Sequence, residues 1–332
     1  EVLAKNNLDS FLKGEKHPLK DILLTGAGGY LGIHILHEFL ENQEGVAYCL
    51  LRGKGGLDAE VRLRGSLFYY FEKDYSSYFG SRIKVVEGDI TKPIKMEEED
   101  LKDISAIINC AALVKHFSAG NEIEEVNVGG VKNLIAFCLE HKLPLVQVST
   151  ASTVKCALSP EAKPISKVDE KHLYVGQTLS NKYVRSKFLA EREILEAVAS
   201  KGLVGKIMRV GNLAPRASDG EFQINYGTNS AMGRLKSFGM LGCVPFETLD
   251  KTMEFSPIDY VAKAINLLCT TPDECVLFHP LNHHSVLFYD VFATMNENGF
   301  SIRPVEGVEF AKKLQEAEAD PEVFTDSDIN WD

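Results

Sequence analysis

The chain has 332 residues, 45% hydrophobic and 25% charged, a composition typical of globular proteins that excludes disordered and fibrous classes. Its 36 basic and 47 acidic residues give a formal net charge of −11, which argues against nucleic-acid binding as the main function. No apolar run reaches the ~18 residues of a membrane span, and the seven cysteines are scattered without CxxC spacing. We therefore expect a cytoplasmic protein with reduced thiols, no metal site and no nucleic-acid or membrane partner.

The first 20 residues are polar and contain no apolar core of the kind that a signal peptide needs. The chain also begins without an initiator methionine. We therefore expect residues 1–20 to form a linker or extension, and the chain to be excised from a longer protein.

Short apolar runs alternate with longer amphipathic stretches between residues 21 and 210. The apolar runs predict buried strands at Ile22–Leu24, Ala47–Leu51, Ile83–Val86, Ala106–Asn109, Leu145–Val148 and Lys206–Val210. The amphipathic stretches predict helices at Tyr30–Glu41, within Leu57–Phe79, at Ile123–His141 and at Leu179–Lys201. Because parallel strands need crossover helices, this alternation is typical of an α/β fold with a Rossmann-type doubly wound parallel sheet.

Residues 211–332 differ in composition and predict a smaller C-terminal region that lies over the carboxyl edge of the sheet and is not an independent domain. We expect this region to bind substrate. From Gly211 to Pro245 the chain is rich in Gly, Asn and Ser and has few strand-like runs. A helix at Ile258–Leu268 and a strand at Val276–Phe278 are expected to return to the core of the sheet domain. Further helices are predicted at Leu287–Asn298 and Val308–Ala319, followed by an acidic tail at 320–332.

A glycine-rich turn follows the first predicted strand and opens the first predicted helix. It consists of Thr25-Gly26-Ala27-Gly28-Gly29-Tyr30-Leu31-Gly32, in which Gly26, Gly29 and Gly32 have a GxxGxxG spacing. The first glycine permits the tight turn, the second lets the backbone approach a pyrophosphate, and the third lets the helix pack on the strand. The helix N-terminus adds free N–H groups and a positive dipole. The turn therefore predicts dinucleotide binding, and no Gly-Lys-Ser/Thr of a P-loop follows it.

The residue after the second predicted strand is Arg52, where an NAD-binding domain would carry an acid for the ribose 2′-hydroxyl. Lys54 and Arg62 follow it along the chain. A guanidinium suits a 2′-phosphate, because it can form bidentate, charge-assisted hydrogen bonds. This cationic cluster in an acidic chain favours NADPH as the cofactor. The alternative is an exposed basic loop without a ligand.

A YxxxK spacing lies on the fourth predicted helix, at Tyr183 and Lys187. Residues four apart share a helix face, so the phenol and the ammonium point the same way. A phenol has a pKa near 10, and a neighbouring ammonium favours the phenolate. Thr150 lies just past the fifth strand, at the sheet edge where ligands bind in such folds. Its hydroxyl can bond a substrate carbonyl beside the tyrosine, with Ser149 and Ser152 as alternatives.

Together these segments resemble the extended short-chain dehydrogenase/reductase superfamily. Within it, the chain is similar to the terminal thioester reductase domains of nonribosomal peptide synthetases and to carboxylic acid reductases. The similarity covers roughly residues 20–270. Besides the glycine-rich turn and the YxxxK pair, it is carried by Leu50-Leu51-Arg52, Glu87-Gly88-Asp89-Ile90, Asn109-Cys110-Ala111-Ala112-Leu113-Val114, Asn127-Val128-Gly129-Gly130, Val148-Ser149-Thr150 and Glu254–Ala262.

The resemblance implies Thr150, Tyr183 and Lys187 as the catalytic set, with Lys187 also holding the nicotinamide ribose. It implies that the three spaced glycines lie at the pyrophosphate and the two arginines at the 2′-phosphate. Asp89 and Ile90 would lie beside the adenine, Ala111, Ala112 and Asn127 would line the cofactor channel, and Val210, Gly211 and Asn212 would lie near the nicotinamide. The full predicted cofactor-binding set is Thr25, Gly26, Gly28, Gly29, Tyr30, Leu31, Gly32, Arg52, Arg62, Asp89, Ile90, Ala111, Ala112, Leu113, Asn127, Ser149, Tyr183, Lys187, Val210, Gly211 and Asn212.

The implied function is NADPH-dependent reductive release of an acyl or peptidyl thioester from a carrier protein, with the aldehyde expected as main product over the alcohol. The implied partner is a phosphopantetheinylated peptidyl carrier protein domain, expected upstream in the same chain. One alternative is a sugar-nucleotide epimerase or dehydratase, against which Arg52 argues. Another is a non-catalytic NADP-sensing module, against which the complete catalytic set argues. No GxSxG elbow supports hydrolytic release.

Overall fold

The structure is a computed structural model that describes residues 1–6, 17–53, 58–114, 120–156, 158–162 and 168–318. Its contacts divide the chain into two compact units. The first unit comprises Glu1–Gly211 and Ile258–Leu281, and the second comprises Asn212–Pro257 and Asn282–Asp332. Lys54 and the acidic tail at 320–332, both considered in the sequence, lie outside the described residues.

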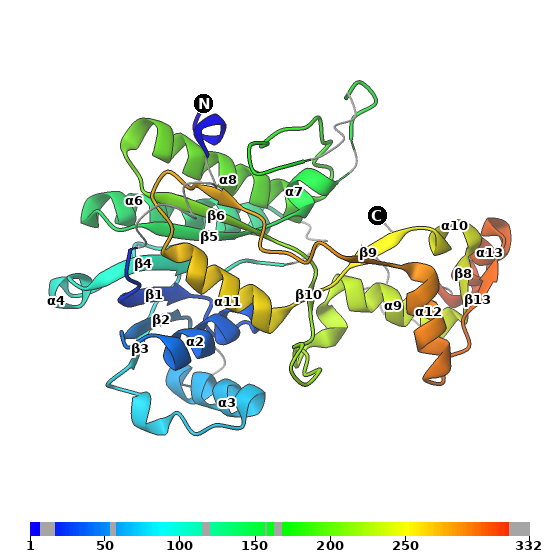
Figure 1. Cartoon of the computed structure of the whole chain (residues 1–332), viewed down its shortest axis with the longest axis horizontal. Helices are drawn as coiled ribbons and strands as arrows, with labels where there is room; N and C mark the ends of the chain where they lie inside the picture. The colour runs from blue at the N-terminus through cyan, green and yellow to red at the C-terminus, as the bar shows by residue number, and fades with distance from the viewer. Residues whose placement is uncertain (7–16, 54–57, 115–119, 157, 163–167, 319–332) are drawn as a thin grey trace. The chain divides into compact units, whose positions relative to one another are not determined.

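A seven-stranded parallel sheet forms the centre of the first unit, with the strand order β11-β6-β5-β4-β1-β2-β3 (Figure 1). Apart from the edge strand β3, which is half-buried, the strands are almost wholly buried, because helices cover both faces and most strand residues are apolar. The predicted doubly wound parallel sheet is confirmed. The strands are β1 (Asp21–Thr25), β2 (Ala47–Leu51), β3 (Ile83–Glu87), β4 (Ile104–Asn109), β5 (Leu145–Thr150), β6 (Gly205–Val210) and β11 (Leu277–Phe278).

The long helices cover the sheet in two layers. One face carries α2, α3 and α11, and the opposite face carries α6 and α8 (Figure 1). The bounds are α2 (Tyr30–Asn42), α3 (Ala59–Phe71), α6 (Gly130–His141), α8 (Lys182–Lys201) and α11 (Ile258–Cys269). Shorter turns are η1 (Leu3–Lys5), η2 (Ser76–Tyr78), α4 (Glu98–Leu101), α5 (Glu122–Glu124) and α7 (Ser152–Lys155). With the order β3-β2-β1 on one side of β4, this arrangement brings the carboxyl ends of β1, β4 and β5 together.

Helix α8 begins at Lys182, three residues after the start predicted at Leu179. The backbone explains the difference, because Leu179 has φ +52°, which no helical residue adopts. Asn181 caps the helix, its side chain accepting a hydrogen bond from the N–H of Val184 at 3.1 Å. Gly202 ends the helix in the left-handed conformation.

The helix predicted at Ile123–His141 is interrupted by one π-helical segment, η3 (Glu125–Gly129). A π-helical segment widens the helix locally and is frequent at functional sites. Here it carries Asn127, whose side chain is 3% exposed. The apolar periodicity of the sequence does not reveal this insertion, because the flanking turns remain α-helical.

The N-terminal residues contact the sheet. The side chain of Asn6 accepts a hydrogen bond from the N–H of Val276 at 2.8 Å and donates one to the carbonyl of Leu277 at 3.1 Å. Asn6 thus satisfies backbone groups at the open edge of the sheet. Residues 1–6, part of the 1–20 stretch that the sequence suggested to be a linker or extension, are therefore packed on the sheet within the first unit.

The second unit has its own apolar core, which includes Phe238, Val244, Phe288, Phe292 and Phe310. Helix α9 (Ser230–Leu241), capped by the Asn229 side chain, was not anticipated from this Gly- and Ser-rich stretch. The other elements are β7 (Leu213–Ala214), η4 (Tyr226–Thr228), β8 (Cys243–Pro245), α10 (Phe246–Leu249), β9 (Thr252–Glu254), β10 (Ser256–Pro257), β12 (Ser285–Leu287), α12 (Phe288–Glu297), β13 (Arg303–Val305) and α13 (Gly307–Glu318).

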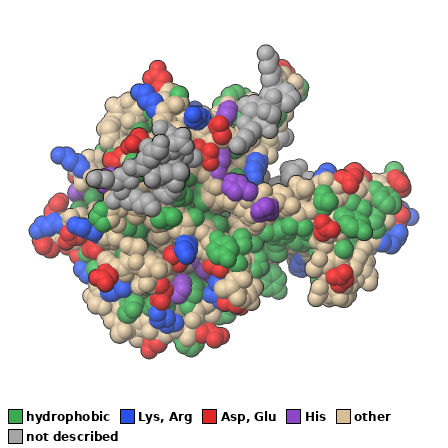
Figure 2. Space-filling model, viewed as in Figure 1, with side chains coloured by type: hydrophobic (Ala, Val, Ile, Leu, Met, Phe, Trp, Pro, Cys, Tyr) green, Lys and Arg blue, Asp and Glu red, His purple; other side chains and the backbone are tan. Residues whose placement is uncertain are grey.

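Within the described part of the chain, no helix combines the length and the apolar character needed to cross a bilayer. On the face drawn in Figure 2, acidic and basic side chains are interspersed over the surface. This mixture follows from the 47 acidic and 36 basic residues of the sequence.

Candidate active site

The glycine-rich turn connects β1 to α2 as the sequence predicts. Gly26 has φ +70°, a conformation that glycine adopts without steric cost, and its carbonyl accepts a hydrogen bond from the N–H of Gly29 at 2.9 Å. Gly29 is the N-cap residue of α2, so the first N–H groups of the helix follow it directly. This turn therefore presents backbone donors at the carboxyl end of β1.

Two of the glycines cannot carry a side chain without a shift of the backbone. A Cβ atom on Gly26 would lie 2.7 Å from the N atom of Ala111, and one on Gly32 would overlap the carbonyl oxygen of Gly26. A Cβ on Gly28 would meet only the Cδ2 atom of Leu51, at 3.8 Å, which is an ordinary contact. The turn thus packs closely on its own helix at Gly32 and on the segment after β4, where Ala111 lies beside Gly26.

The two arginines predicted at a 2′-phosphate lie together at the carboxyl end of β2. Arg62, on α3, donates a hydrogen bond from Nη2 to the carbonyl oxygen of Arg52. The Nη1 atom of Arg52 lies 3.8 Å from Oδ2 of Asp89, and the Arg52 side chain is 70% exposed. Hydrogen bonds from Thr91 and the Arg52 charge hold the pKa of Asp89 below its usual value, although partial burial opposes them. Ile90, adjacent to Asp89, is buried.

A chain of buried hydrogen bonds links this turn to the predicted catalytic lysine. Thr25 Oγ1 donates to Asn109 Oδ1 at 2.5 Å, and Asn109 Nδ2 donates to Gln147 Oε1 at 2.7 Å. Gln147 Nε2 and Lys187 Nζ both donate to the carbonyl oxygen of Val148, at 2.7 Å and 2.9 Å. The ends of β1, β4 and β5 and the ammonium of Lys187 are therefore held in one polar network.

Asn127 joins the segment after β4 to helix α8. Its Oδ1 accepts from the N–H of Leu113 at 2.8 Å, and its Nδ2 donates to the Leu113 carbonyl at 3.1 Å and to Ser186 Oγ at 2.9 Å. These bonds engage the whole side-chain amide. Asn127 therefore fixes the backbone that carries Ala112 and Leu113, while its predicted place along a cofactor channel stays a prediction.

Thr150, Tyr183 and Lys187 come from two elements that pack on each other. Thr150 is the last residue of β5, Tyr183 and Lys187 lie on α8, and α8 packs against β5. The Thr150 hydroxyl accepts a hydrogen bond from the N–H of Ser152 at 3.2 Å, which orients it at the sheet edge. Lys187 is 4% exposed. The shared placement of the three residues and the burial of the Lys187 ammonium make this set a candidate for chemistry in the first unit.

Desolvation controls the charge of this set. Burial raises the pKa of Tyr183 to about 12, whereas the sequence predicted that the ammonium would favour the phenolate. Burial lowers the pKa of Lys187 to about 8, partly offset by the charge of the Glu191 carboxylate. The structure therefore holds Tyr183 as a protonated hydroxyl at neutral pH and leaves Lys187 mostly charged.

The residues predicted near the nicotinamide follow β6. Val210 pairs with Thr150 in the sheet, and its carbonyl accepts from the N–H of Ala151 at 2.8 Å. Gly211 is the last residue of this part of the first unit. Asn212 belongs to the second unit, where its N–H donates to Glu254 Oε2 at 2.8 Å.

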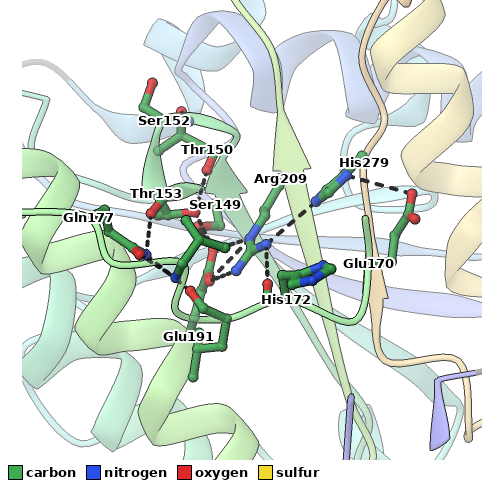
Figure 3. Close-up of polar contacts among 12 residues, drawn as sticks. Ser149, Thr150, Ser152, Thr153, Glu170, His172, Gln177, Glu191, Arg209 and His279 are labelled. Carbon is green, nitrogen blue, oxygen red and sulfur yellow. Dashed lines mark hydrogen bonds and ion pairs between the residues drawn. The ribbon is translucent and has the colours of Figure 1, made fainter. Parts of the chain in front are cut away.

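The sequence analysis missed a fully buried ion pair beside this set. Ser149, whose predicted contact with the cofactor stays a prediction, donates a hydrogen bond from its hydroxyl to Oε1 of Glu191 at 2.5 Å. Arg209 Nη2 lies 2.6 Å from Oε2 of the same carboxylate (Figure 3). Two signals could have revealed the pair. Glu191 stands four residues after Lys187 on the same helix face, and Arg209 is a charged residue in a fully buried strand whose only other charged residue is Lys206.

Known proteins resemble this chain over most of its length. A thiolation-reductase di-domain from an archaeal nonribosomal peptide synthetase has 42% sequence identity and a TM-score of 0.85, covering 95% of this chain and 67% of that one. A linear gramicidin synthase from Brevibacillus parabrevis is 25% identical over 92% of this chain. Carboxylic acid reductase from Mycobacterium tuberculosis is 25% identical over 80% of this chain. The chain spans only 6% and 24% of the lengths of these last two proteins.

These relatives confirm the resemblance predicted from the sequence. The model of one protein family, NAD_binding_4, matches residues 24–265, from the end of β1 to within α11. This range contains the glycine-rich turn, the arginines after β2 and the YxxxK pair, and the family name denotes binding of a nicotinamide dinucleotide. The chain therefore belongs to the NAD_binding_4 family, described as Male sterility protein.

Proposed function

We propose that this chain is the terminal reductase domain of a nonribosomal peptide synthetase and releases a carrier-bound acyl or peptidyl thioester as an aldehyde. The observation that carries the proposal is the 42% identity, over 95% of this chain and 67% of the other, to a thiolation-reductase di-domain. A thiolation domain holds its cargo as a thioester. The proposed partner is accordingly a phosphopantetheinylated peptidyl carrier protein domain, upstream in the same polypeptide.

NADPH is the cofactor that we propose. The turn at Gly26 and Gly32 has room for backbone only, as a pyrophosphate cradle at a helix N-terminus requires. Among the described residues, the Nε atom of Arg62 is buried without a hydrogen-bond partner, beside the exposed guanidinium of Arg52. Two guanidinium groups at the end of β2 suit the 2′-phosphate of NADPH, which carries charge that NADH lacks.

Reduced nicotinamide, when bound, supplies a hydride for the thioester carbonyl carbon. As the new C–H bond forms, the carbonyl oxygen gains negative charge. The hydroxyls of Tyr183 and Thr150 donate hydrogen bonds to this oxygen, and Tyr183 transfers its proton. Its raised pKa of about 12 favours this donor role, because the hydroxyl remains protonated at neutral pH.

Lys187 has two roles in this proposal. Its ammonium, bonded to the carbonyl of Val148, would hold the ribose of the bound nucleotide and would stabilise the phenolate that proton transfer leaves on Tyr183. The thiohemiacetal then collapses. Its hydroxyl proton is lost as the C=O bond re-forms, the C–S bond breaks, and the leaving sulfur takes up a proton. The products are an aldehyde and a free phosphopantetheine thiol.

We further propose a cytoplasmic location. All seven cysteines are free thiols, and four of them are buried. Free, scattered thiols are usual in a reducing compartment. A nicotinamide reductase that depends on a carrier protein would operate there.

The test offers an acyl-phosphopantetheinyl carrier protein to the chain with NADPH or NADH. We expect carrier-dependent NADPH oxidation at the nicotinamide absorbance band, one NADPH per chain released, and an aldehyde that hydrazine reagents trap. Free NADPH with unloaded carrier is the control. Absence of oxidation with loaded carrier would refute the proposed function, and two NADPH per chain with recovered alcohol would refute the proposed product.

A further inference from the structure

The buried ion pair of Glu191 and Arg209 lies at the junction of β5, β6 and α8 (Figure 3). Both side chains are completely inaccessible to solvent. Arg209 Nε lies 3.0 Å from Oε1 and 3.2 Å from Oε2 of Glu191, and Nη2 lies 2.6 Å from Oε2. The contact is therefore a forked pair, the geometry that fixes direction as well as distance. Burying two charges without this compensation would be strongly unfavourable.

Glu191 also receives the side chains on both sides of Thr150. Ser149 Oγ donates to Oε1 at 2.5 Å, and Thr153 Oγ1 lies 3.3 Å from the same oxygen. The single hydroxyl proton of Thr153 has its shorter acceptor in the Thr150 carbonyl oxygen, at 2.9 Å. The Glu191 carboxylate thus contacts Ser149 at the end of β5 and Thr153 on the short helix α7, the residues that flank the predicted catalytic Thr150.

The Nη1 group of Arg209, which does not contact Glu191, bonds to the segment that precedes α8. Its Nη1 donates to the carbonyl of His172 at 2.8 Å and lies 3.5 Å from Nε2 of His279. Gln177, in the same segment, donates to the carbonyl of Thr153 at 2.8 Å. This segment leads directly into the N-cap of α8. The ion pair therefore fixes both the segment before α8, through His172, and the middle of α8, through Glu191.

The pair shares a helix face with the catalytic set. Glu191 follows Lys187 by four residues and Tyr183 by eight, so the three side chains lie in one row along α8. The helix can rotate or slide on the sheet only if the contacts between these side chains and the strands are broken. The bonds of Glu191 to β5 and β6 fix one end of the row.

We propose that Glu191 and Arg209 are positioning residues of the reductase site, which hold Tyr183 and Lys187 in register with Thr150. The proposal rests on the proposed function for the reaction that it serves. Neither residue touches the reacting atoms. Their role is to fix how α8 is rotated against the carboxyl end of β5, and to set the electric field at the Lys187 ammonium.

The charges around Lys187 determine the direction in which its pKa shifts. The groups near the Lys187 ammonium are Glu191 from its own helix, Cys110 from the segment after β4, and the carbonyl of Val148 from β5. Tyr183 stands one helical turn before Lys187 on the same face. Burial lowers its pKa to about 8, and the Glu191 carboxylate raises that pKa. Loss of the carboxylate leaves the Arg209 charge unbalanced and should disfavour the ammonium. Loss of Arg209 should favour it.

Two single variants and one double variant test the proposal in the full chain. In Glu191→Gln the pKa of Lys187 should fall, and in Arg209→Met it should rise. The pKa is read without substrate from ¹³C NMR of labelled lysine side chains, assigned with Lys187→Arg. A merely structural pair would not shift the Lys187 titration in opposite directions.

The double variant Glu191→Met/Arg209→Met removes both charges, a change that buried ion pairs often tolerate without loss of stability. It should fold cooperatively, show a Lys187 titration near that of the wild type, and reduce carrier-bound thioester with kcat about 10–100-fold lower at nearly unchanged KM. This variant decides the question if the single variants do not fold. Wild-type kcat in the folded double variant would overturn the proposal.

Glu193→Gln is the matched control. Glu193 lies on the same helix two residues after Glu191 and pairs at 3.4 Å with Lys132, whose side chain is 57% exposed. We expect its kcat and its Lys187 titration to equal those of the wild type. If the wild type itself does not reduce the thioester, the proposed function fails, and the lysine titrations still decide whether the pair controls Lys187.

Discussion

Replacing Gly32 by alanine tests the close packing of the glycine-rich turn. The added methyl group would overlap the Gly26 carbonyl oxygen and lie 2.8 Å from Gly26 C and 3.0 Å from Ala27 Cα. These are backbone atoms that cannot rotate away, so α2 must withdraw from the end of β1. Overpacking costs about 1–3 kcal/mol, and a clash with backbone atoms falls in the upper part of that range, about 2–3 kcal/mol. The helix preference of alanine over glycine returns ~1 kcal/mol of this cost. We expect a net loss of about 1–2 kcal/mol in the free energy of unfolding.

The withdrawal also moves the first N–H groups of α2 away from the pyrophosphate that we propose for this turn. NADPH should therefore bind at least about tenfold more weakly, which corresponds to ~1.4 kcal/mol. Denaturant unfolding followed by circular dichroism measures the first effect, and calorimetric titration with NADPH the second.

Gly28→Ala is the control for stability, because its methyl group would meet only Leu51 Cδ2 at 3.8 Å. We expect its free energy of unfolding to stay within about 0.5 kcal/mol of the wild type. Equal stability of Gly32→Ala and Gly28→Ala would refute the packing role of Gly32.

Three further predictions concern the site. Tyr183→Phe should lower the rate of thioester reduction by about 10²–10⁴ with NADPH affinity nearly intact, and near-normal turnover would remove Tyr183 from the mechanism. Arg52→Ala should weaken the binding of NADPH by about 1.5 kcal/mol and leave the binding of NADH unchanged. This is the low end for a hydrogen bond to a charged group, because the Arg52 side chain is 70% exposed. Equal weakening of both cofactors in calorimetry would contradict a 2′-phosphate role. Because the folded pKa of Lys187 is lowered from 10.5 to about 8, the unfolded chain holds a proton that the folded chain lacks between these pH values. The free energy of unfolding should therefore gain a rising contribution as pH increases through this window, which Lys187→Met should lack.

The sequence determined the fold through local patterns. Continuous apolar runs bounded by turns predicted six strands of the parallel sheet within a few residues of their observed bounds, because a strand covered by helices on both faces is apolar throughout. The spacing of Gly26, Gly29 and Gly32 predicted a turn whose sterics depend only on nearby backbone. The YxxxK spacing predicted that Tyr183 and Lys187 share a helix face, since helical periodicity is local as well.

What only the tertiary structure decided involves residues distant in sequence or the exclusion of water. The π-helical segment with Asn127 depends on partners at Leu113 and Ser186, which no periodicity encodes. Desolvation raises the Tyr183 pKa where proximity to an ammonium predicted the opposite, because burial acts on a group through all its surroundings. The pairing of Glu191 with Arg209 is a property of the packed core. Each residue alone would belong on a surface, and only the fold brings the two charges close enough to be buried together.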